Sequence, residues 1–389
     1  MNMLKISILS ISLATVTGGA AVAPALGLIA KHFASEDEIL IKLIITLPSL
    51  FIILSSLVFA KLANFLNVKQ LAFIGFTLFI VGGISPFFLD NIYQVLFCRA
   101  ILGLGTGFLM PLSVSLLGFL FKKEEQGKLM GLSAMCNQLG AVITVSFSGF
   151  LASISWQYSF LIYLFALVLF ILNMIFLPKI IIAQKEKKLD LRNVKNLSGI
   201  YINLFFMQVL FFNFTNNFSI IYQKEQIISA SFIGVIMGLN GLFGAIASMK
   251  LQALIKKIRT KIKITGAILY ILAFSLFSIR LDEPFSILGI NIMLIIGIIA
   301  AILNGLAVGF TLPFLFSQIS TRSKKQNLAT NMAIASIATF SGQFASPLID
   351  EILENIFNLH HPRDAFLIAS FLAILLFIYN LRLKIKLKN

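Results

Sequence analysis

The sequence predicts an all-α membrane protein with twelve transmembrane helices in two pseudo-symmetric six-helix bundles. Composition, the length of the apolar runs and an internal duplication predict this fold. Of the 389 residues, 59% are hydrophobic and only 12% are charged, whereas soluble domains carry about 25% charged residues. The apolar runs are roughly 20 residues long, which is the length that a helix needs to cross a bilayer. The solvent of most side chains is therefore lipid.

The duplication is visible in a glycine-rich and proline-containing segment. Five residues recur with a constant offset of 202 positions: Gly103, Leu104, Gly107, Phe108 and Pro111 recur as Gly305, Leu306, Gly309, Phe310 and Pro313. Repetition of this kind indicates that the chain consists of two related halves. Arg99 belongs to the first copy alone, because Ala301 occupies its position in the second.

The apolar runs divide into two sets of six. We expect spanning helices at about 5–30, 39–60, 71–89, 93–119, 129–153, 158–178, 199–222, 230–250, 263–280, 286–316, 328–349 and 364–382. The predicted domains are an N-terminal six-helix half at 1–178, a cytoplasmic central loop at 179–198 and a C-terminal six-helix half at 199–389.

Lysine and arginine fix the expected orientation. One set of connections, which includes the central loop and both termini, holds 25 of the 31 basic residues. Short cytoplasmic loops carry such an excess, so we expect both termini in the cytoplasm and the protein in a bacterial inner membrane. The net charge of +16 is spread over all these loops, which argues against a nucleic-acid groove and favours contact with anionic lipid headgroups.

Residues that serve catalysis or metal binding are scarce. The two cysteines lie in apolar runs, and the three histidines lie in polar connections without zinc-ligand spacing. We therefore expect no metal, no cofactor and no enzymatic activity.

Arg99 is the one basic residue expected inside the membrane. An arginine near the middle of a spanning helix costs about 2.5–3.5 kcal/mol on insertion scales, so it normally faces a wet cavity or a partner. The functional interpretation is a cavity residue that binds substrate or responds to a proton. The structural alternative is an arginine hydrogen-bonded to carbonyl groups of broken helices.

The repeated glycines and prolines have a structural interpretation. Gly103 and Gly107, like Gly305 and Gly309, are four residues apart, so each pair places a small surface on one helix face for close packing. Pro111 and Pro313 each remove a backbone hydrogen bond and can bend their helices.

The seventh predicted helix is unusually polar for a membrane span. Asparagine and glutamine alternate there with phenylalanine, and another amide lies on the tenth helix. Neutral amides among aromatic rings suit an uncharged or amphipathic ligand, although hydrogen bonding between helices is the alternative for any single one. The candidate substrate-binding residues are Arg99, Gln208, Phe212, Asn213, Asn216 and Asn304.

Proton coupling requires a group that titrates, and arginine stays protonated. All 15 carboxylates are expected in polar connections or at helix rims. Asp90 and Asp350, at the outer ends of the third and eleventh helices, are the candidates for taking the proton, in communication with Arg99. The alternative is that both are solvated rim residues.

The two halves, the cytoplasmic termini and the basic central loop resemble the major facilitator superfamily. Arg99 followed by Gly103, Gly105 and Gly107 is similar to the fourth-helix motif of its proton-coupled members, especially the twelve-helix drug-proton antiporters. The segment that begins at Trp156 resembles the start of the sixth helix in that branch. The resemblance implies that the first, fourth, seventh and tenth helices line a central cavity.

The chain departs from the family pattern after the second helix. The family motif there normally has an aspartate that joins gating ion pairs, whereas this chain has Asn64 and keeps the charge of Lys61. The fifth-helix antiporter motif also lacks its proline.

The function expected from the resemblance is export of small drug-like compounds by alternating access, in exchange for protons. One alternative is a carrier for a single small polar metabolite, such as a sugar or amino-acid derivative. Another is a membrane sensor that does not transport. The expected partners are a small-molecule substrate, protons and lipid, with the protein as a monomer.

Overall fold

The computed structural model describes residues 3–121, 123–182, 191–258, 261–280, 286–287, 290–323 and 327–382. Helices make up nearly all of these residues, and the chain divides into two compact units. Unit 1 comprises Met1–Glu186 with Ala230–Gly234, and unit 2 comprises Lys187–Ser229 with Val235–Asn389. Parts of the predicted central loop (183–190) and of the C-terminal half (383–389) lie outside the described residues. The predicted domain boundaries therefore stay predictions.

The first part of the chain contains seven α-helices and three 3-10 helices. They are α1 (Met3–Val16), η1 (Ala20–Ala25), α2 (Leu26–His32), α3 (Glu38–Leu62), α4 (Val68–Ile84), η2 (Ser85–Phe88), α5 (Ile92–Leu120), α6 (Lys123–Ala152), η3 (Trp156–Leu164) and α7 (Phe165–Phe176).

The second part contains six α-helices and one pair of short strands. They are α8 (Leu191–Lys224), α9 (Ala230–Ile258), α10 (Ile262–Phe277), β1 (Ser286–Ile287), β2 (Ile290–Asn291), α11 (Ile292–Arg322), α12 (Leu328–Ile356) and α13 (Asp364–Arg382).

Within the described residues, nine helical segments are long and apolar enough to cross a membrane, and one bent pair would make a tenth. Leu139–Ala152 and Ile262–Phe277 are shorter apolar helices in the regions where the fifth and ninth spans are expected. The protein is thus an all-α integral membrane protein, and the number of twelve spans stays a prediction.

The first predicted span, 5–30, is not one continuous helix. Met3–Thr15 and Ala20–His32 meet at an angle of 41°. Two glycines, Gly18 and Gly19, lie at the break, and Pro24 inside η1 has no N–H to donate. The break leaves main-chain carbonyl groups without helical partners.

The tenth predicted span, 286–316, is wrong at its start. Residues Ser286 and Ile287 pair with Asn291 and Ile290 in an antiparallel two-stranded ladder. The helix begins only at Ile292, because the Asn291 side chain accepts a hydrogen bond from the N–H of Met293 and so caps α11.

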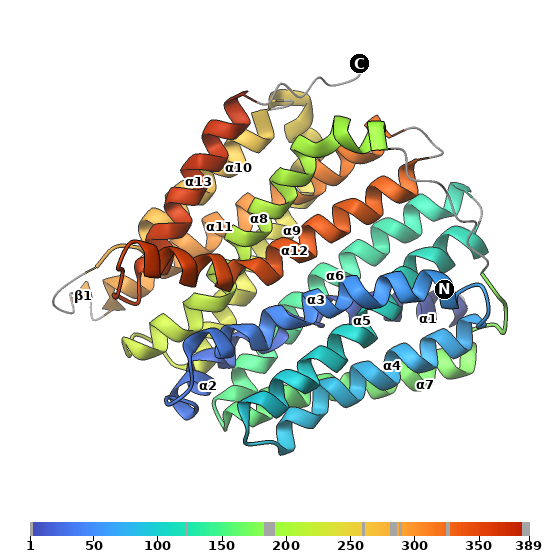
Figure 1. Cartoon of the computed structure of the whole chain (residues 1–389), viewed down its shortest axis with the longest axis horizontal. Helices are drawn as coiled ribbons and strands as arrows, with labels where there is room; N and C mark the ends of the chain where they lie inside the picture. Colours follow the sequence, from blue (N-terminus) through green and yellow to red (C-terminus); the bar gives the residue numbers. More distant parts are fainter. Residues whose placement is uncertain are drawn as a thin grey trace. The chain divides into compact units, whose positions relative to one another are not determined.

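In unit 1, α5 packs between α3 and α4, and α4 also contacts α7 (Figure 1). Glycines permit the close approach. A Cβ atom on Gly103 would lie 2.4 Å from the carbonyl oxygen of Pro48, and one on Gly105 would lie 2.4 Å from the main-chain nitrogen of Phe79. The predicted packing role of Gly103 therefore has a specific partner in α3.

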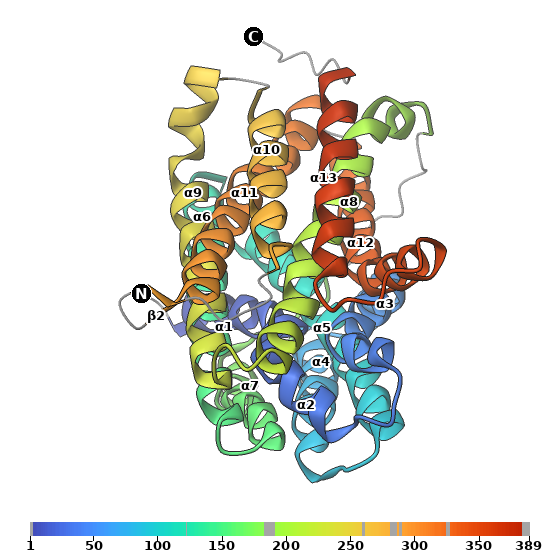
Figure 2. The ribbon, with the colours of Figure 1, turned by 90° about the vertical axis from the view of Figure 1, so that its left-hand side faces the viewer.

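In unit 2, α10 packs between α11 and α13 (Figure 2). The close pair of α9 and α11 repeats the contacts of α3 and α5. A Cβ atom on Gly305 would lie 2.2 Å from the carbonyl oxygen of Asn240, and one on Gly309 would lie 2.2 Å from that of Gly244. In unit 1, a Cβ atom on Gly107 would likewise lie 2.7 Å from the carbonyl oxygen of Ile52.

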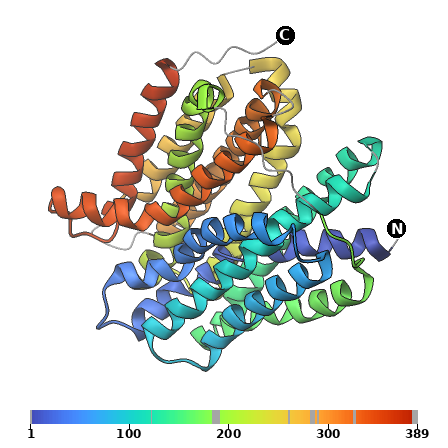
Figure 3. The same ribbon diagram turned by 45° about the vertical axis from the view of Figure 1, so that its right-hand side comes forward.

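Helices α8 and α12 also pack side by side in unit 2 (Figure 3). The Ser346 hydroxyl donates a hydrogen bond to the carbonyl oxygen of Val209, and Asn213 contacts Asp350. Residues four apart on one helix thus meet residues four apart on the other, so the two helices run parallel. Each fourth residue of α8 is presented to α12, and this places Asn213 opposite Asp350.

Candidate functional site

Arg99 is completely buried in unit 1 and donates to main-chain oxygens from two other elements. Its Nε donates to the carbonyl oxygen of Ile44 at 2.8 Å. Its Nη2 donates to the carbonyl oxygens of Gly18 at 3.4 Å and Gly19 at 3.2 Å. The guanidinium group therefore joins α5 to α3 and to the break in the first helix.

The acceptors of Arg99 are carbonyl groups that their own helices leave unpaired. In a regular helix the Ile44 oxygen would accept from the N–H of residue 48, but Pro48 has none. Gly18 and Gly19 lie between the end of α1 and the start of η1. Buried carbonyl groups without partners are costly in lipid, so the arginine compensates for a proline in one helix and a break in another.

Tyr163, in η3, holds Arg99 from a third side. Its hydroxyl accepts from Nη1 of Arg99 at 3.0 Å and donates to the carbonyl oxygen of Thr17 at 3.1 Å. The guanidinium carbon also lies 5.4 Å from the Tyr163 ring centroid and 5.9 Å from that of Phe160, within the range of cation–π attraction. All three guanidinium nitrogens are thus engaged inside unit 1.

Asp350 has surroundings that the sequence analysis did not anticipate. It was expected at a helix rim, but it is completely buried. That placement was wrong because α12 continues to Ile356, beyond the predicted end at 349, so Asp350 lies inside the helix. Asp364, also expected at the rim, is 3% exposed.

Two amides of α8 bind the Asp350 carboxyl group. Nδ2 of Asn213 donates to Oδ1 at 2.8 Å and to Oδ2 at 2.9 Å, and it also donates to the carbonyl oxygen of Ala365 at 3.0 Å. Nδ2 of Asn217 donates to Oδ2 at 3.1 Å. Asn217 was not among the candidate site residues; its spacing of four from Asn213, one helical turn, was the signal that could have identified it.

Asn216 and Asn304 are buried amides whose side-chain nitrogen and oxygen have no hydrogen-bond partner in the described structure. They lie on helices that pack antiparallel, α8 and α11. The Tyr222 hydroxyl donates to the carbonyl oxygen of Met293 at 3.3 Å, and the Thr311 hydroxyl contacts the sulfur of Met207 at 2.8 Å. Both asparagines lie between these two contacts on their helices.

The other candidate residues have contacts of their own. Phe212 is buried, and Gln208 is buried with its side chain 3.5 Å from that of Gln343. Asp90 is an exposed carboxylate that contacts Nε2 of His32 at 2.5 Å. Asp90 belongs to unit 1 and Gln208 to unit 2.

The two prolines lie on the helices where they were expected, and the gating candidates Lys61 and Asn64, expected in the loop after the second span, lie in the last turn of α3 and in the turn that follows it. Pro111 lies inside α5 and Pro313 inside α11. Lys61 is exposed in the last turn of α3, and the Asn64 amide reaches the carbonyl oxygen of Ala60 at 3.5 Å. Their predicted part in gating stays a prediction.

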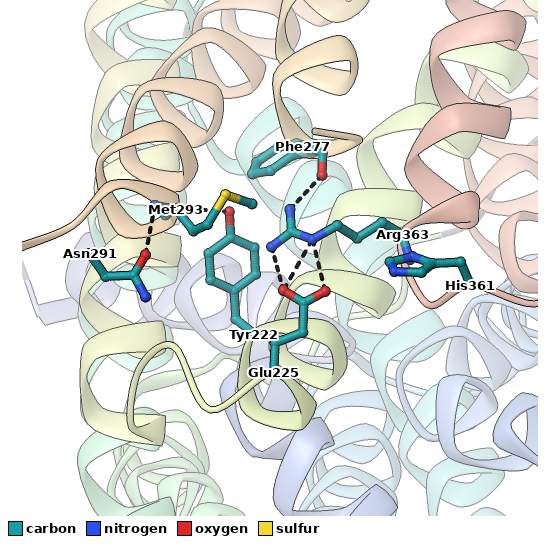
Figure 4. A network of polar contacts seen from close by, with 7 residues as sticks. All are labelled: Tyr222, Glu225, Phe277, Asn291, Met293, His361 and Arg363. Carbon is teal, nitrogen blue, oxygen red and sulfur yellow. Dashed lines mark hydrogen bonds and ion pairs between the residues drawn. The ribbon is translucent and has the colours of Figure 1, made fainter. Parts of the chain in front are cut away.

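A second network, which sequence reasoning missed, closes one end of unit 2 (Figure 4). The guanidinium group of Arg363 donates to both carboxylate oxygens of Glu225, at 2.8, 3.1 and 2.6 Å. It also donates to the carbonyl oxygen of Phe277 at 2.7 Å and lies 5.2 Å from the Tyr222 ring centroid. The ends of α8 and α10 are thereby tied to the residue that precedes α13.

Electrostatics keep Arg363 charged in this buried place. Burial opposes the charge, but the hydrogen bond and the charge of Glu225, together with Tyr222, outweigh it and raise the pKa of Arg363 above its usual range. Next to it, the carboxylate of Asp364 pairs with Arg280 and accepts a hydrogen bond from the N–H of His361 at 2.8 Å.

Within the described residues, no group of three or more histidine, cysteine, aspartate or glutamate side chains is arranged to hold a metal ion. The polar groups that the structure does bring together are amides, a carboxyl group and arginines. They bind by hydrogen bonds and charge, and the carboxyl group can carry a proton.

Residues 8–347 and 200–386 match the Major Facilitator Superfamily, and the chain belongs to this superfamily of membrane transporters. A curated relative is Multidrug resistance protein 3 of Bacillus subtilis (strain 168), which is 29% identical over 113 residues. The match covers 27% of this chain, and the chain spans only about a fifth (21%) of the length of that relative.

Solved transporter structures share the fold. The nucleoside transporter NupG has a TM-score of 0.76 at 14% identity and covers 99% of this chain and 100% of its own. A bacterial homologue of the human lysosomal transporter Spinster has a TM-score of 0.74 at 12% identity, with coverage of 97% and 95%. The D-xylose-proton symporter has a TM-score of 0.69 at 14% identity, with 98% of each chain covered. At these identities the likeness shows the fold alone.

Proposed function

We propose that the protein is a secondary active transporter that exports small amphipathic compounds in exchange for protons, with Asp350 as the proton carrier. The observation that carries this proposal is the buried carboxyl group bound by Asn213 and Asn217. A carboxyl group inside a membrane bundle is expensive to place and therefore marks a functional site.

Asn213 can serve both protonation states of Asp350. Its Nδ2 donates to the carboxylate, and its Oδ1 is buried without a hydrogen-bond partner. If the side-chain amide group of Asn213 rotated by half a turn, Oδ1 would become an acceptor for the O–H of a protonated carboxyl group. Asn213 thus supplies a donor for the ionised form of Asp350 and an acceptor for its protonated form. A carboxyl group that takes up and releases a proton needs both.

The export of drug-like compounds rests on two supports. One is the partial match to the Bacillus subtilis multidrug resistance protein. The other is the sequence pattern around Arg99, which resembles that of drug-proton antiporters. In this proposal Arg99 holds the helices of unit 1 in place through its carbonyl contacts, and exchange of the proton takes place at Asp350.

The basic residues support the membrane and orientation that go with this function. We place both termini in the cytoplasm of a bacterial inner membrane because one set of connections holds most of the lysines and arginines. We also propose that a single chain is the working unit.

The test uses inverted membrane vesicles that contain the full chain or its variants. Export from the cell becomes uptake into such vesicles, so a proton gradient should drive accumulation of a fluorescent amphipathic dye. Asp350→Asn should abolish gradient-driven uptake, and the exposed Asp90→Asn is the matched control that should retain it. Uptake that survives a protonophore, or equal loss in both variants, would exclude Asp350 as the proton carrier.

The second candidate function is transport of one small polar metabolite. Asn216 and Asn304 favour it, because buried amides without partners are costly unless a ligand or water binds them. A screen of radiolabelled sugars and amino-acid derivatives in the same vesicles separates the two functions. Uptake of one such compound, lost in Asn304→Leu, together with no dye transport, would replace the export proposal. No transport of any compound would favour the sensor.

A further inference from the structure

A groove of about 480 Å³ opens at one polar boundary of unit 1, within the roughly 300–1,000 Å³ typical of ligand sites. It lies where α4 begins and α7 has ended. Its apolar lining is formed by Leu66, Phe73, Ile74 and Met174, and two lysines, Lys69 and Lys179, complete it together with Asn67 and Gln70.

A main-chain hydrogen bond brings the two lysines to the same end of the groove. The N–H of Val68 donates to the carbonyl oxygen of Ile180 at 2.8 Å. Lys69 and Lys179 directly adjoin these two residues in the chain, so two segments more than a hundred residues apart each contribute a lysine to the lining of the groove. The main-chain hydrogen bond therefore fixes where the two lysines lie in the fold.

The side-chain oxygens of Asn67 and Gln70 already accept hydrogen bonds within the groove lining. The Asn67 side chain accepts from the N–H of Gln70, and the Gln70 side chain accepts from the N–H of Asn67, both at 3.0 Å. Among the described residues, no carboxylate forms an ion pair with Lys69 or Lys179. Two positive charges are thus left at the end of an apolar surface.

An apolar groove with paired positive charges at one end matches an amphiphile whose chain is apolar and whose head is anionic. The groove lies at the polar end of the spans α4 and η3–α7, the level where lipid headgroups meet the acyl region. We infer that this groove binds an anionic phospholipid, with the phosphate group between Lys69 and Lys179 and one acyl chain along Phe73, Ile74 and Met174.

The test measures lipid binding to the full chain in detergent by native mass spectrometry. Dioleoyl phosphatidylglycerol is the anionic probe and dioleoyl phosphatidylcholine is its neutral counterpart. The variant Lys69→Gln/Lys179→Gln removes the paired charges, and Ile74→Trp fills the apolar part while it keeps both lysines. The control Lys250→Gln/Lys261→Gln removes two exposed lysines of unit 2, so the change in net charge is the same.

We expect one phosphatidylglycerol to bind tightly to the wild type, about 30-fold more weakly to the lysine double variant, and with unchanged affinity to the control. Ile74→Trp should also weaken binding, because the acyl chain loses its place. Equal binding of phosphatidylcholine, or equal weakening in the control pair, would overturn the proposal. Displacement of the lipid by inorganic phosphate would show a simple anion site and would overturn it too.

Discussion

Arg99 donates its Nε–H to the carbonyl oxygen of Ile44 at 2.8 Å, the oxygen that Pro48 leaves without a helical partner. The buried charge of Arg99 in the fourth predicted span is thus explained by Pro48 in the second predicted span. Arg99, Ile44 and Pro48 form one structural unit. The energetic coupling between Arg99 and Pro48 can therefore be measured.

The first prediction concerns this coupling. Arg99→Ala should destabilise the protein, because buried carbonyl groups lose their donors, at roughly 1–3 kcal/mol for each unsatisfied group. Pro48→Ala restores an N–H for the Ile44 oxygen. In the Pro48→Ala background, Arg99→Ala should therefore cost less, by about 0.5–3 kcal/mol. Denaturant unfolding of the four proteins in detergent measures the difference, and strictly additive effects would contradict it.

The second prediction separates two glycines of the same helix. Gly103→Ala should destabilise strongly, because the new Cβ would lie 2.4 Å from a backbone oxygen of α3. Gly118→Ala is the matched control, because nothing lies within 4 Å of its Cβ position. It should be neutral or stabilising by up to about 1 kcal/mol. Thermal unfolding of both variants is the measurement, and equal shifts would argue against close packing at Gly103.

The third prediction concerns the corresponding contact in unit 2. Nδ2 of Asn240 donates to the carbonyl oxygen of Ala301 at 2.8 Å. That oxygen lies inside α11, where the N–H of Gly305 is available to it, so Asn240→Leu should cost only about 0.6 kcal/mol. A loss as large as that of Arg99→Ala, measured by the same unfolding assay, would show that the two contacts carry equal weight.

The fourth prediction concerns the pair of Glu225 and Arg363. Glu225→Ala leaves a guanidinium group that is 1% exposed without its carboxylate. The loss should approach, but not reach, the roughly 3–5 kcal/mol of a fully buried pair, because Glu225 is partly exposed. Unfolding measurements on Glu225→Ala test this, and Glu225→Gln should recover part of the loss. A change within error in both variants would contradict it.

The same pair has a defined dependence on pH. A raised pKa means that the stability contributed by Arg363 is present below its unfolded pKa and is lost only as pH rises through the folded one. The pKa of Arg363 lies far above neutral pH in both the folded and the unfolded state. The stability lost in Arg363→Met should therefore be constant across the neutral range.

The fifth prediction concerns the amides that bind Asp350. Asn213→Ala removes a donor to both carboxylate oxygens; because a hydrogen bond to a charged group contributes about 1.5–3 kcal/mol, gradient-driven dye uptake should fall about tenfold or more. Asn203→Ala is the control, because that amide is buried on the same helix but donates to the carbonyl oxygen of Gly199 in its own helix. Equal uptake by the two variants would separate Asn213 from the proton site.

Sequence periodicity and composition predict the helical membrane fold well, because burial in lipid requires long apolar runs. They predict the partners of a polar residue poorly. Asp350 looked like a rim residue because the apolar run ends before it, yet the helix continues and the amides of α8 cover it. The carbonyl groups that bind Arg99 belong to segments 55 and about 80 residues away along the sequence. No local sequence pattern predicts contacts between residues so far apart in the chain. Arg363 was missed for the same reason, whereas the spacing of four residues between Asn213 and Asn217 was a local signal that could have identified Asn217.

The contacts of the α3–α5 pair and the α9–α11 pair have a further consequence. In the first pair the donor, Arg99, lies on α5 and its acceptor lies on α3; in the second the donor, Asn240, lies on α9 and its acceptor, Ala301, occupies the place of the arginine. A hydrogen bond thus links the two helices of each pair, but it runs in opposite directions: from α5 to α3 in the first pair and from α9 to α11 in the second.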